Sequence, residues 1–289
     1  MKFRAIQAEK ASYPVALMCA CLSVSRSGYY AWESRPESGR VLDDKRMAGE
    51  VEAVFKTSRR TYGYPRIYRD LQNKGRRIGR HRVARLMREQ GLQSIHRRRF
   101  RVATTQADPA HQAAENTLSR QFKVEKPNDV WVADITCVPT AEGWLYLALL
   151  VDLYARRIVG WSMGDHMRTE LPLDAWKMGL SRRGAPRLHH SDRGSQYTSH
   201  AYRGELEAAG TRVSMSRKGE CHDNAVAESV FATIKVELVH RQKFATRAAA
   251  RAALFEYMEV FYNRNRLHST LGYQTPVDFE KQTSGDLVG

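Results

Sequence analysis

The stretch VWVADITCVPTAEGWLYLALLVDLYARRIVGWSM, residues 130–163, decides the fold class. It contains three runs rich in β-branched and aromatic residues, which are typical of strands. The runs cover residues 130–138, 144–152 and 156–163. Because only short breaks separate them, they predict an antiparallel meander of three strands.

The sequence after the meander alternates between helical and extended patterns. The expected elements are a helix at 169–181, a strand at 187–192, a helix at 199–209, a strand at 211–216, and helices at 225–239 and 245–262. Strands mixed with helices in this order predict an α/β domain with a mixed sheet flanked by helices.

The sequence before the meander is strongly basic. Residues 1–120 hold 25 Lys and Arg against 11 Asp and Glu, so they carry most of the net charge of +16. Residues 14–34 and the segment from Tyr62 to Gly91 each have the pattern of a helix, a turn and a helix. We therefore expect a small all-α, helix-turn-helix-like basic region that binds a polyanion. For residues 14–34 an ordinary helical hairpin stays open.

Within the second of these units, a helix carries cations opposite its apolar stripe. At 100° per residue its outward face presents His81, Arg82, Arg85 and Arg88. From Lys56 to Arg101 there are 16 basic residues against two acidic ones. This surplus favours a phosphate-binding surface, with a solvated charged face as the alternative.

Composition shifts along the chain suggest five segments. They are a helical segment at 1–50, a basic helix-turn-helix-like domain at 51–101, a linker at 102–122, an α/β core at 123–240, and a C-terminal helix and tail at 241–289. The whole chain has 289 residues and is 42% hydrophobic, which excludes wholesale disorder.

Two further function classes are excluded by composition. The four cysteines form no Cys-x-x-Cys pair, so neither a disulfide framework nor a zinc site is indicated. The longest apolar run, 144–151, is far shorter than the roughly 18 residues of a membrane helix. We expect no membrane partner and a cytoplasmic location.

Three carboxylates stand out by position. Asp134 lies within an expected strand among apolar neighbours, Asp192 ends another strand, and Glu228 lies on a helix. A carboxylate in a central strand is costly unless it is paired or bound to a cation. Between the first two lie 57 residues, and between the last two lie 35. Lys235 follows Glu228 by seven residues, on the same helix face.

This spacing, on this order of elements, resembles the catalytic core of DDE transposases and retroviral integrases, which have a ribonuclease H-like fold. Six short sequence motifs make the resemblance more specific, because together they resemble the second-reading-frame (orfB-type) protein of two-frame bacterial insertion sequences. They are 130–136 (VWVADIT), 190–197 (HSDRGSQY), 223–225 (DNA), 62–66 (YGYPR), 27–32 (SGYYAW), and Tyr262-Asn263 through Thr275-Pro276.

The resemblance implies a polynucleotidyl transferase, a transposase that cuts DNA strands and joins 3′-hydroxyl ends. It implies that Asp134, Asp192 and Glu228 hold Mg²⁺ or Mn²⁺, with two ions per site and Asp134 bridging them. Hard oxygen ligands suit such ions independently of the family. Further expected partners are double-stranded DNA, other copies of the chain, and an upstream-frame protein or fusion region, in the bacterial cytoplasm.

Other residues have weaker expected roles. The candidates for contact with DNA are Arg66, His81, Arg82, Arg85, Arg88, Arg97, Arg98, Arg99, Lys218, Lys235 and Arg266. His190 and Asn224 are expected beside the carboxylates, supporting them rather than binding metal. The cluster around Arg266 could equally cap a helix end, and Asp152 is expected to be structural.

Two rival functions remain open from the sequence. One is a non-catalytic DNA-binding regulator derived from a transposase. The other is a plain metal-dependent nuclease of the same fold, which hydrolyses DNA without transfer.

Overall fold

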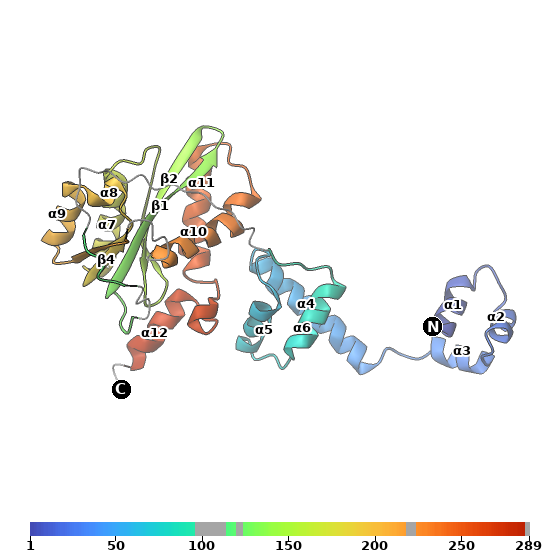
Figure 1. Cartoon of the computed structure of the whole chain (residues 1–289). Helices are drawn as coiled ribbons and strands as arrows, with labels where there is room; N and C mark the ends of the chain where they lie inside the picture. The colour runs from blue at the N-terminus through green and yellow to red at the C-terminus, as the bar shows by residue number, and fades with distance from the viewer. Residues whose placement is uncertain (96–113, 120–123, 218–223, 287–289) are drawn as a thin grey trace. The chain divides into compact units, whose positions relative to one another are not determined.

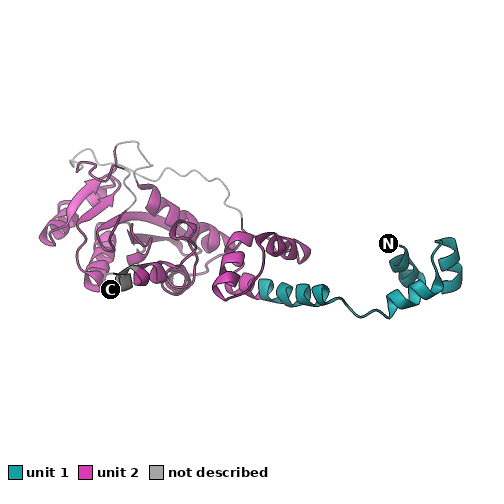
Figure 2. Cartoon of the chain, turned by 90° about the horizontal axis from the view of Figure 1, so that it is seen from below, with its two compact units in different colours: residues 1–52 teal, residues 53–289 magenta. Residues whose placement is uncertain are grey.

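The computed structural model describes residues 1–95, 114–119, 124–217 and 224–286, with side chains as far as Gln282. The chain divides into two compact units, residues 1–52 and residue 53 onward (Figure 2). Within the described ranges, no helix is both long and apolar enough to cross a bilayer.

The first unit is helical. It contains α1 (Lys2–Glu9), α2 (Val15–Cys21), α3 (Arg26–Glu33) and most of α4 (Gly39–Thr57). The side chain of Ser25 caps α3 by accepting a hydrogen bond from the Gly28 amide at 3.0 Å. Ile6, Cys19 and Tyr29 form a small core. The expected succession of helix, turn and helix at 14–34 is present, and α1 packs with it.

The basic domain in the second unit pairs α5 (Tyr64–Asn73) with α6 (Arg80–Glu89). Pro65 lies in the first turn of α5, where its missing N–H costs no helical hydrogen bond. The side chains that the sequence assigns to the apolar faces are buried. They are Ile67, Leu71, Val83, Leu86 and Met87.

The sheet contains β1 (Val130–Thr140), β2 (Gly143–Asp152), β3 (Ile158–Gly164), β4 (Leu188–Ser191) and β5 (Arg212–Met215). Their order is β3-β2-β1-β4-β5. The first three strands pair antiparallel, as the meander predicts, and β4 and β5 add in parallel to β1. The central strand is therefore β1, in a mixed sheet of the expected ribonuclease H-like kind.

Helices cover the sheet. They are α7 (Glu170–Arg183), α8 (Ser195–Thr198), α9 (His200–Ala208), α10 (Ala225–Glu237), α11 (Arg247–Phe255) and α12 (Pro276–Asp286), with 3₁₀ turns at Val239–Arg241 and Ser269–Leu271. In Figure 1, α7 and α9 lie to one side of β1 and β2, and α10 and α11 lie to the other. The expected mixed sheet flanked by helices is confirmed.

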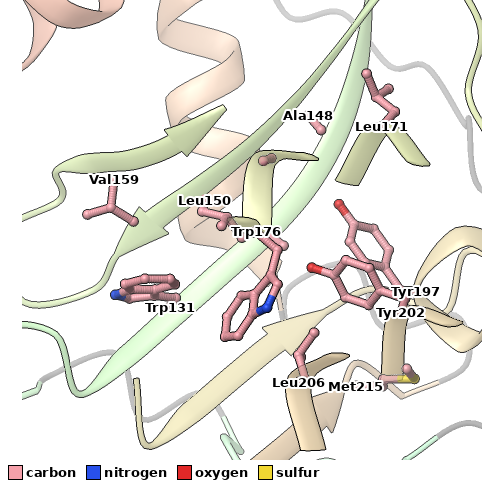
Figure 3. Close-up of a cluster of buried hydrophobic side chains, with 12 residues drawn as sticks. Trp131, Ala148, Leu150, Val159, Leu171, Trp176, Tyr197, Tyr202, Leu206 and Met215 are labelled. Atoms are coloured by element: carbon pink, nitrogen blue, oxygen red, sulfur yellow. The ribbon is translucent and has the colours of Figure 1, made fainter. Parts of the chain in front are cut away.

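The core between the sheet and α7 is aromatic (Figure 3). The rings of Trp131 and Trp176 meet edge to face, with centroids 5.6 Å apart. A Cβ on Gly160 would lie 2.3 Å from the carbonyl oxygen of Ala175. Only glycine therefore lets α7 approach β3 this closely.

Two details differ from the expected elements. The helix expected at 245–262 is α11 followed by a π-helix, η3 (Glu256–Tyr262). Helices α4 and α12 have no expected counterpart, although the buried apolar residues of α4 follow helical spacing, at Met47, Val51, Val54 and Phe55.

Part of the expected linker lies on the sheet. In residues 114–119, the amides of Thr117 and Leu118 donate to Ser214 Oγ on β5, at 3.0 and 3.2 Å. The Leu118 side chain is buried. This short segment therefore covers the edge strand of the sheet.

Candidate active site

The strand register places Asp134 and Asp192 side by side. In the parallel pair of β1 and β4, Val132 lies opposite His190. Two residues further along each chain stand Asp134 and Asp192. Neighbouring strands are about 4.8 Å apart. Asp134 on β1 and Asp192 at the end of β4 therefore lie next to each other.

Each of these carboxylates is oriented by its own backbone. Asp134 Oδ1 accepts the Ile135 amide at 2.8 Å, and Asp192 Oδ1 accepts the Gly194 amide at 2.9 Å. Both bonds stabilise the ionised form of the side chain.

Helix α10 brings the third carboxylate. Asn224, just before the helix, is buried, and its Nδ2 donates to the carbonyl oxygen of Ala133 at 3.0 Å. This bond attaches the start of α10 to β1, next to Asp134. Glu228 follows one turn later with an exposed side chain, and Lys235 lies two turns beyond it. Asn224, which the sequence analysis expects beside the carboxylates, thus contacts the backbone of the residue before Asp134.

The charges at this site act on one another. Burial raises the pKa of Asp134 well above its usual value, and the negative charges of Asp192 and Glu228 raise it further. The Ile135 amide and the Lys235 ammonium oppose this change.

This donor set fits a hard divalent cation. All three side chains offer carboxylate oxygens, which are the ligands that Mg²⁺ and Mn²⁺ prefer. A cation would also relieve the repulsion that raises the pKa of Asp134. Nevertheless, among the side chains that the structure describes, no three His, Cys, Asp or Glu already stand close enough to hold one ion. Binding would therefore need these side chains to move closer together.

The two histidines before Asp192 make ordinary buried contacts. His190 bridges β4 and β5, with Nδ1 2.9 Å from Ser214 Oγ and Nε2 3.2 Å from Ser216 Oγ. His189 Nε2 lies 3.0 Å from the Tyr202 hydroxyl, and burial lowers the pKa of His189 to about 3. These contacts fix the strand that presents Asp192.

Tyr197 is a residue near the site to which sequence reasoning gives no role. Its hydroxyl is buried and has no hydrogen-bond partner in the described part of the chain. Burial and the nearby Tyr202 raise the pKa of Tyr197, and the charges of Asp134 and Asp192 raise it further. Its only sequence signal is its place five residues after Asp192 in the quoted motif.

The expected cationic face of α6 is present in part. His81 and Arg88 are exposed, whereas Arg82 and Arg85 are half-buried, and Arg85 pairs with Glu89 at 2.9 Å. The turn before α6 adds exposed cations that the sequence analysis missed, although the run GRRIGR is visible at 75–80. Two of them, Arg76 and Arg77, line a hollow of about 480 Å³.

The other residues expected to contact DNA are either outside the described ranges or at least partly buried. Arg97, Arg98, Arg99 and Lys218 lie outside the described residues. The expectation that Arg266 contacts DNA is wrong, because its side chain is buried and donates to Glu237. Arg66 is partly buried, near the same carboxylate.

Comparisons with known proteins identify two kinds of domain in this chain. Models of the integrase core domain match residues 124–221 and 228–283, and a model of an HTH-like domain matches residues 42–100. The structure of the HTLV-2 integrase catalytic core domain in complex with magnesium overlaps with a TM-score of 0.41 at 17% identity, covering 54% of this chain and 97% of that one. This similarity is too low to support a conclusion beyond the one that the sheet topology gives.

Two relatives match nearly end to end. The 31 kDa protein of insertion element IS600 from Shigella sonnei is 43% identical over 92% of this chain and 98% of the relative. Transposase InsF for insertion sequence IS3A from Escherichia coli K12 is 40% identical over 98% of this chain and 99% of the relative. The chain therefore belongs to the family of insertion-sequence transposases of this orfB type, with an HTH-like domain before an integrase core.

Proposed function

We propose that this transposase is a metal-dependent DNA strand transferase of the DDE type, with Asp134, Asp192 and Glu228 as its catalytic carboxylates. One observation carries the proposal. The pairing of β1 with β4 puts Asp134 beside Asp192, and Asn224 joins the start of α10, which carries Glu228, to the residue before Asp134. The negative charges of Asp192 and Glu228 also raise the pKa of Asp134. A fold tolerates such repulsion most readily where a cation binds.

Asp134, Asp192 and Glu228 would hold Mg²⁺ or Mn²⁺, with two ions per site. Such ions activate an oxygen nucleophile and offset negative charge on the phosphate undergoing transfer. The protein residues orient this chemistry. Backbone amides fix one oxygen of Asp134 and one of Asp192, and Asn224 holds the start of α10 against β1. Lys235, whose charge reaches Asp134, would contact the DNA backbone.

The basic domain would hold the DNA. Its proposed contacts are His81, Arg82, Arg85 and Arg88 on α6, together with Arg76 and Arg77 in the preceding turn. Two element ends must be joined to one target, so we propose that the protein acts as a multimer on double-stranded DNA. An upstream-frame protein or fusion region remains a proposed partner.

The test is a strand-transfer assay with Mg²⁺ and a labelled duplex that has a 3′-hydroxyl end. Joined and cleaved products are separated on a gel for the wild type and for Glu228→Gln. The matched control is Glu205→Gln, the same change at an exposed helical glutamate on α9. We expect joining by the wild type and the control, and none by Glu228→Gln.

The other outcomes separate the rival functions. Cleavage without joining in the wild type would identify a plain nuclease. DNA binding with neither cleavage nor joining, with or without an added upstream-frame region, would identify a regulator. Normal joining by Glu228→Gln would overturn the assignment of the site.

A further inference from the structure

The helix that carries Glu228 ends in a second, buried glutamate. Glu237 lies nine residues later, two and a half turns along α10, and therefore on the opposite side of the helix. Its carboxylate accepts hydrogen bonds from Arg266, at 2.6 Å from Nη2 and 2.9 Å from Nε, and from the Tyr257 hydroxyl at 2.7 Å. All three side chains are nearly inaccessible to solvent.

This buried cluster extends to the basic domain. Tyr62, which is 2% exposed, donates from its hydroxyl to the carbonyl oxygen of Asn265 at 3.2 Å. The same hydroxyl accepts the Leu267 amide at 2.7 Å. Arg66 lies 4.0 Å from Glu237 Oε1, with its guanidinium 5.5 Å from the Tyr62 ring centre. The residues on either side of Arg266 thus bind Tyr62, while Arg266 itself binds α10.

A second contact lies beside the first. Arg59 forms an ion pair with Glu256, and its guanidinium lies 4.9 Å from the centre of the Phe261 ring. Arg241 Nη1 donates to the backbone oxygen of Arg59 at 2.6 Å. Glu256 and Phe261 belong to the π-helix η3, a rare conformation that often occurs at functional segments.

Stability alone is a weak explanation for this cluster. A buried ion pair is often no more stabilising than apolar residues of the same size, and in some proteins such pairs specify one geometry. Here the geometry that is fixed relates the basic domain to the helix that carries Glu228. Two of the motifs found in the sequence, YGYPR at 62–66 and the segment after Tyr262, are the two sides of this contact.

We propose that Tyr62 is a positioning residue: with Arg59 it links the basic domain to α10, so that DNA held by the basic domain fixes the helix that presents Glu228. The proposal rests on the proposed role of Glu228. It assigns Tyr62 no contact with DNA or with the reacting phosphate.

The test is hydrogen exchange of the full chain, followed by mass spectrometry, with and without a mixed-sequence duplex of about 40 base pairs at low salt. The variant is Tyr62→Phe, which removes both hydroxyl contacts but keeps the ring. The matched control is Tyr64→Phe, the same change at a 46% exposed ring two residues away. The melting temperature without DNA verifies that each variant is folded.

In the wild type and in Tyr64→Phe, we expect DNA to slow exchange both in residues 64–89 and in α10, residues 225–237. In Tyr62→Phe we expect the slowing in 64–89 to persist and the slowing in α10 to fall at least about threefold. Equal slowing of α10 in the variant, or none in the wild type, would overturn the proposal.

A charge exchange gives a second, independent test if Tyr62→Phe proves unstable. Arg59→Glu should abolish the effect of DNA on α10 by repelling Glu256, and the double change with Glu256→Arg should restore it. Failure of the restoration counts against the link. Because exchange is measured without strand transfer, these results are independent of whether Glu228→Gln abolishes joining.

Discussion

The two ends of α10 treat negative charge in opposite ways. At its start, Glu228 is exposed, and its charge adds to that of Asp192 in raising the pKa of Asp134. At its end, Glu237 is buried and receives hydrogen bonds from Arg266 and Tyr257. One end accumulates negative charge, whereas the other neutralises it within the fold.

This difference separates structure from function on a single helix. Where a carboxylate holds the fold together, the protein supplies a cation and satisfies its oxygen atoms. Where carboxylates repel one another, Lys235 offsets the negative charge only in part, and a divalent ion would supply the rest. The contrast can be tested from both ends.

The largest expected effect is at the repelling end. Asp192→Asn should lower the rate of strand joining by about a thousandfold or more, since a metal ligand is lost. The melting temperature should change little, because the Gly194 amide can bond to the amide oxygen of asparagine instead. Gel-based joining assays and thermal unfolding measure the two quantities, and joining near the wild-type rate would remove Asp192 from the site.

The next largest effect is at the neutralised end. Arg266→Met should reduce the free energy of unfolding by about 3–5 kcal/mol, because it leaves Glu237 buried without its cation. Adding Glu237→Leu should recover most of this loss. Urea unfolding of both variants provides the measurement, and a loss below about 1 kcal/mol for the single change would mean that water reaches Glu237.

A smaller effect, opposite in sign, is expected for Asp134 without metal. Its raised pKa means that the folded state holds the proton more tightly than the unfolded state. This contribution to stability is present at low pH and is lost as the pH rises through the folded-state pKa.

Asp134→Asn should therefore melt at a higher temperature than the wild type at pH 8 in EDTA, by about 2–4 °C for each kcal/mol gained. The gain should shrink as the pH falls toward 4, and Mg²⁺ should stabilise the wild type but not the variant. A variant that is less stable at pH 8 would contradict the proposed repulsion.

The smallest expected effect compares two buried tyrosines. Tyr257→Phe removes a hydrogen bond to Glu237 and should cost about 1–3 kcal/mol. Tyr197→Phe removes a hydroxyl that has no partner in the described residues, so it should be neutral or slightly stabilising. Chemical unfolding of both variants and the wild type measures the two changes in the free energy of unfolding. A similar cost at Tyr197 would reveal a bound water or another partner for its hydroxyl.

Much of the fold follows from local sequence patterns. The three runs at 130–163 form the expected meander, and the apolar spacing in α5 and α6 identifies the buried faces of both helices. These features are predictable because period-2 and period-3.6 patterns depend on residues close together in the chain. The π-helix at 256–262 follows no such simple period, and its sequence alone predicts an ordinary helix.

The candidate site is predictable only in its residue types and spacing. Asp134, Asp192 and Glu228 are identifiable because carboxylates are unusual within strands and their spacing resembles a known family. That Asp134 lies beside Asp192 depends on the pairing of β1 with β4, which joins segments 58 residues apart. Tyr197 is missed because only its burial, among residues distant in sequence, makes it unusual.

The sequence by itself determined the order of elements, the basic and neutral halves, and which carboxylates are candidates for metal binding. Only the tertiary structure decided the fate of individual charges. Arg266 looks like any exposed cation in the sequence, yet it neutralises Glu237, 29 residues away, and its neighbour Leu267 binds Tyr62, 205 residues away. Partners at such separations leave no periodic signal, because long-range packing rather than local propensity brings them together.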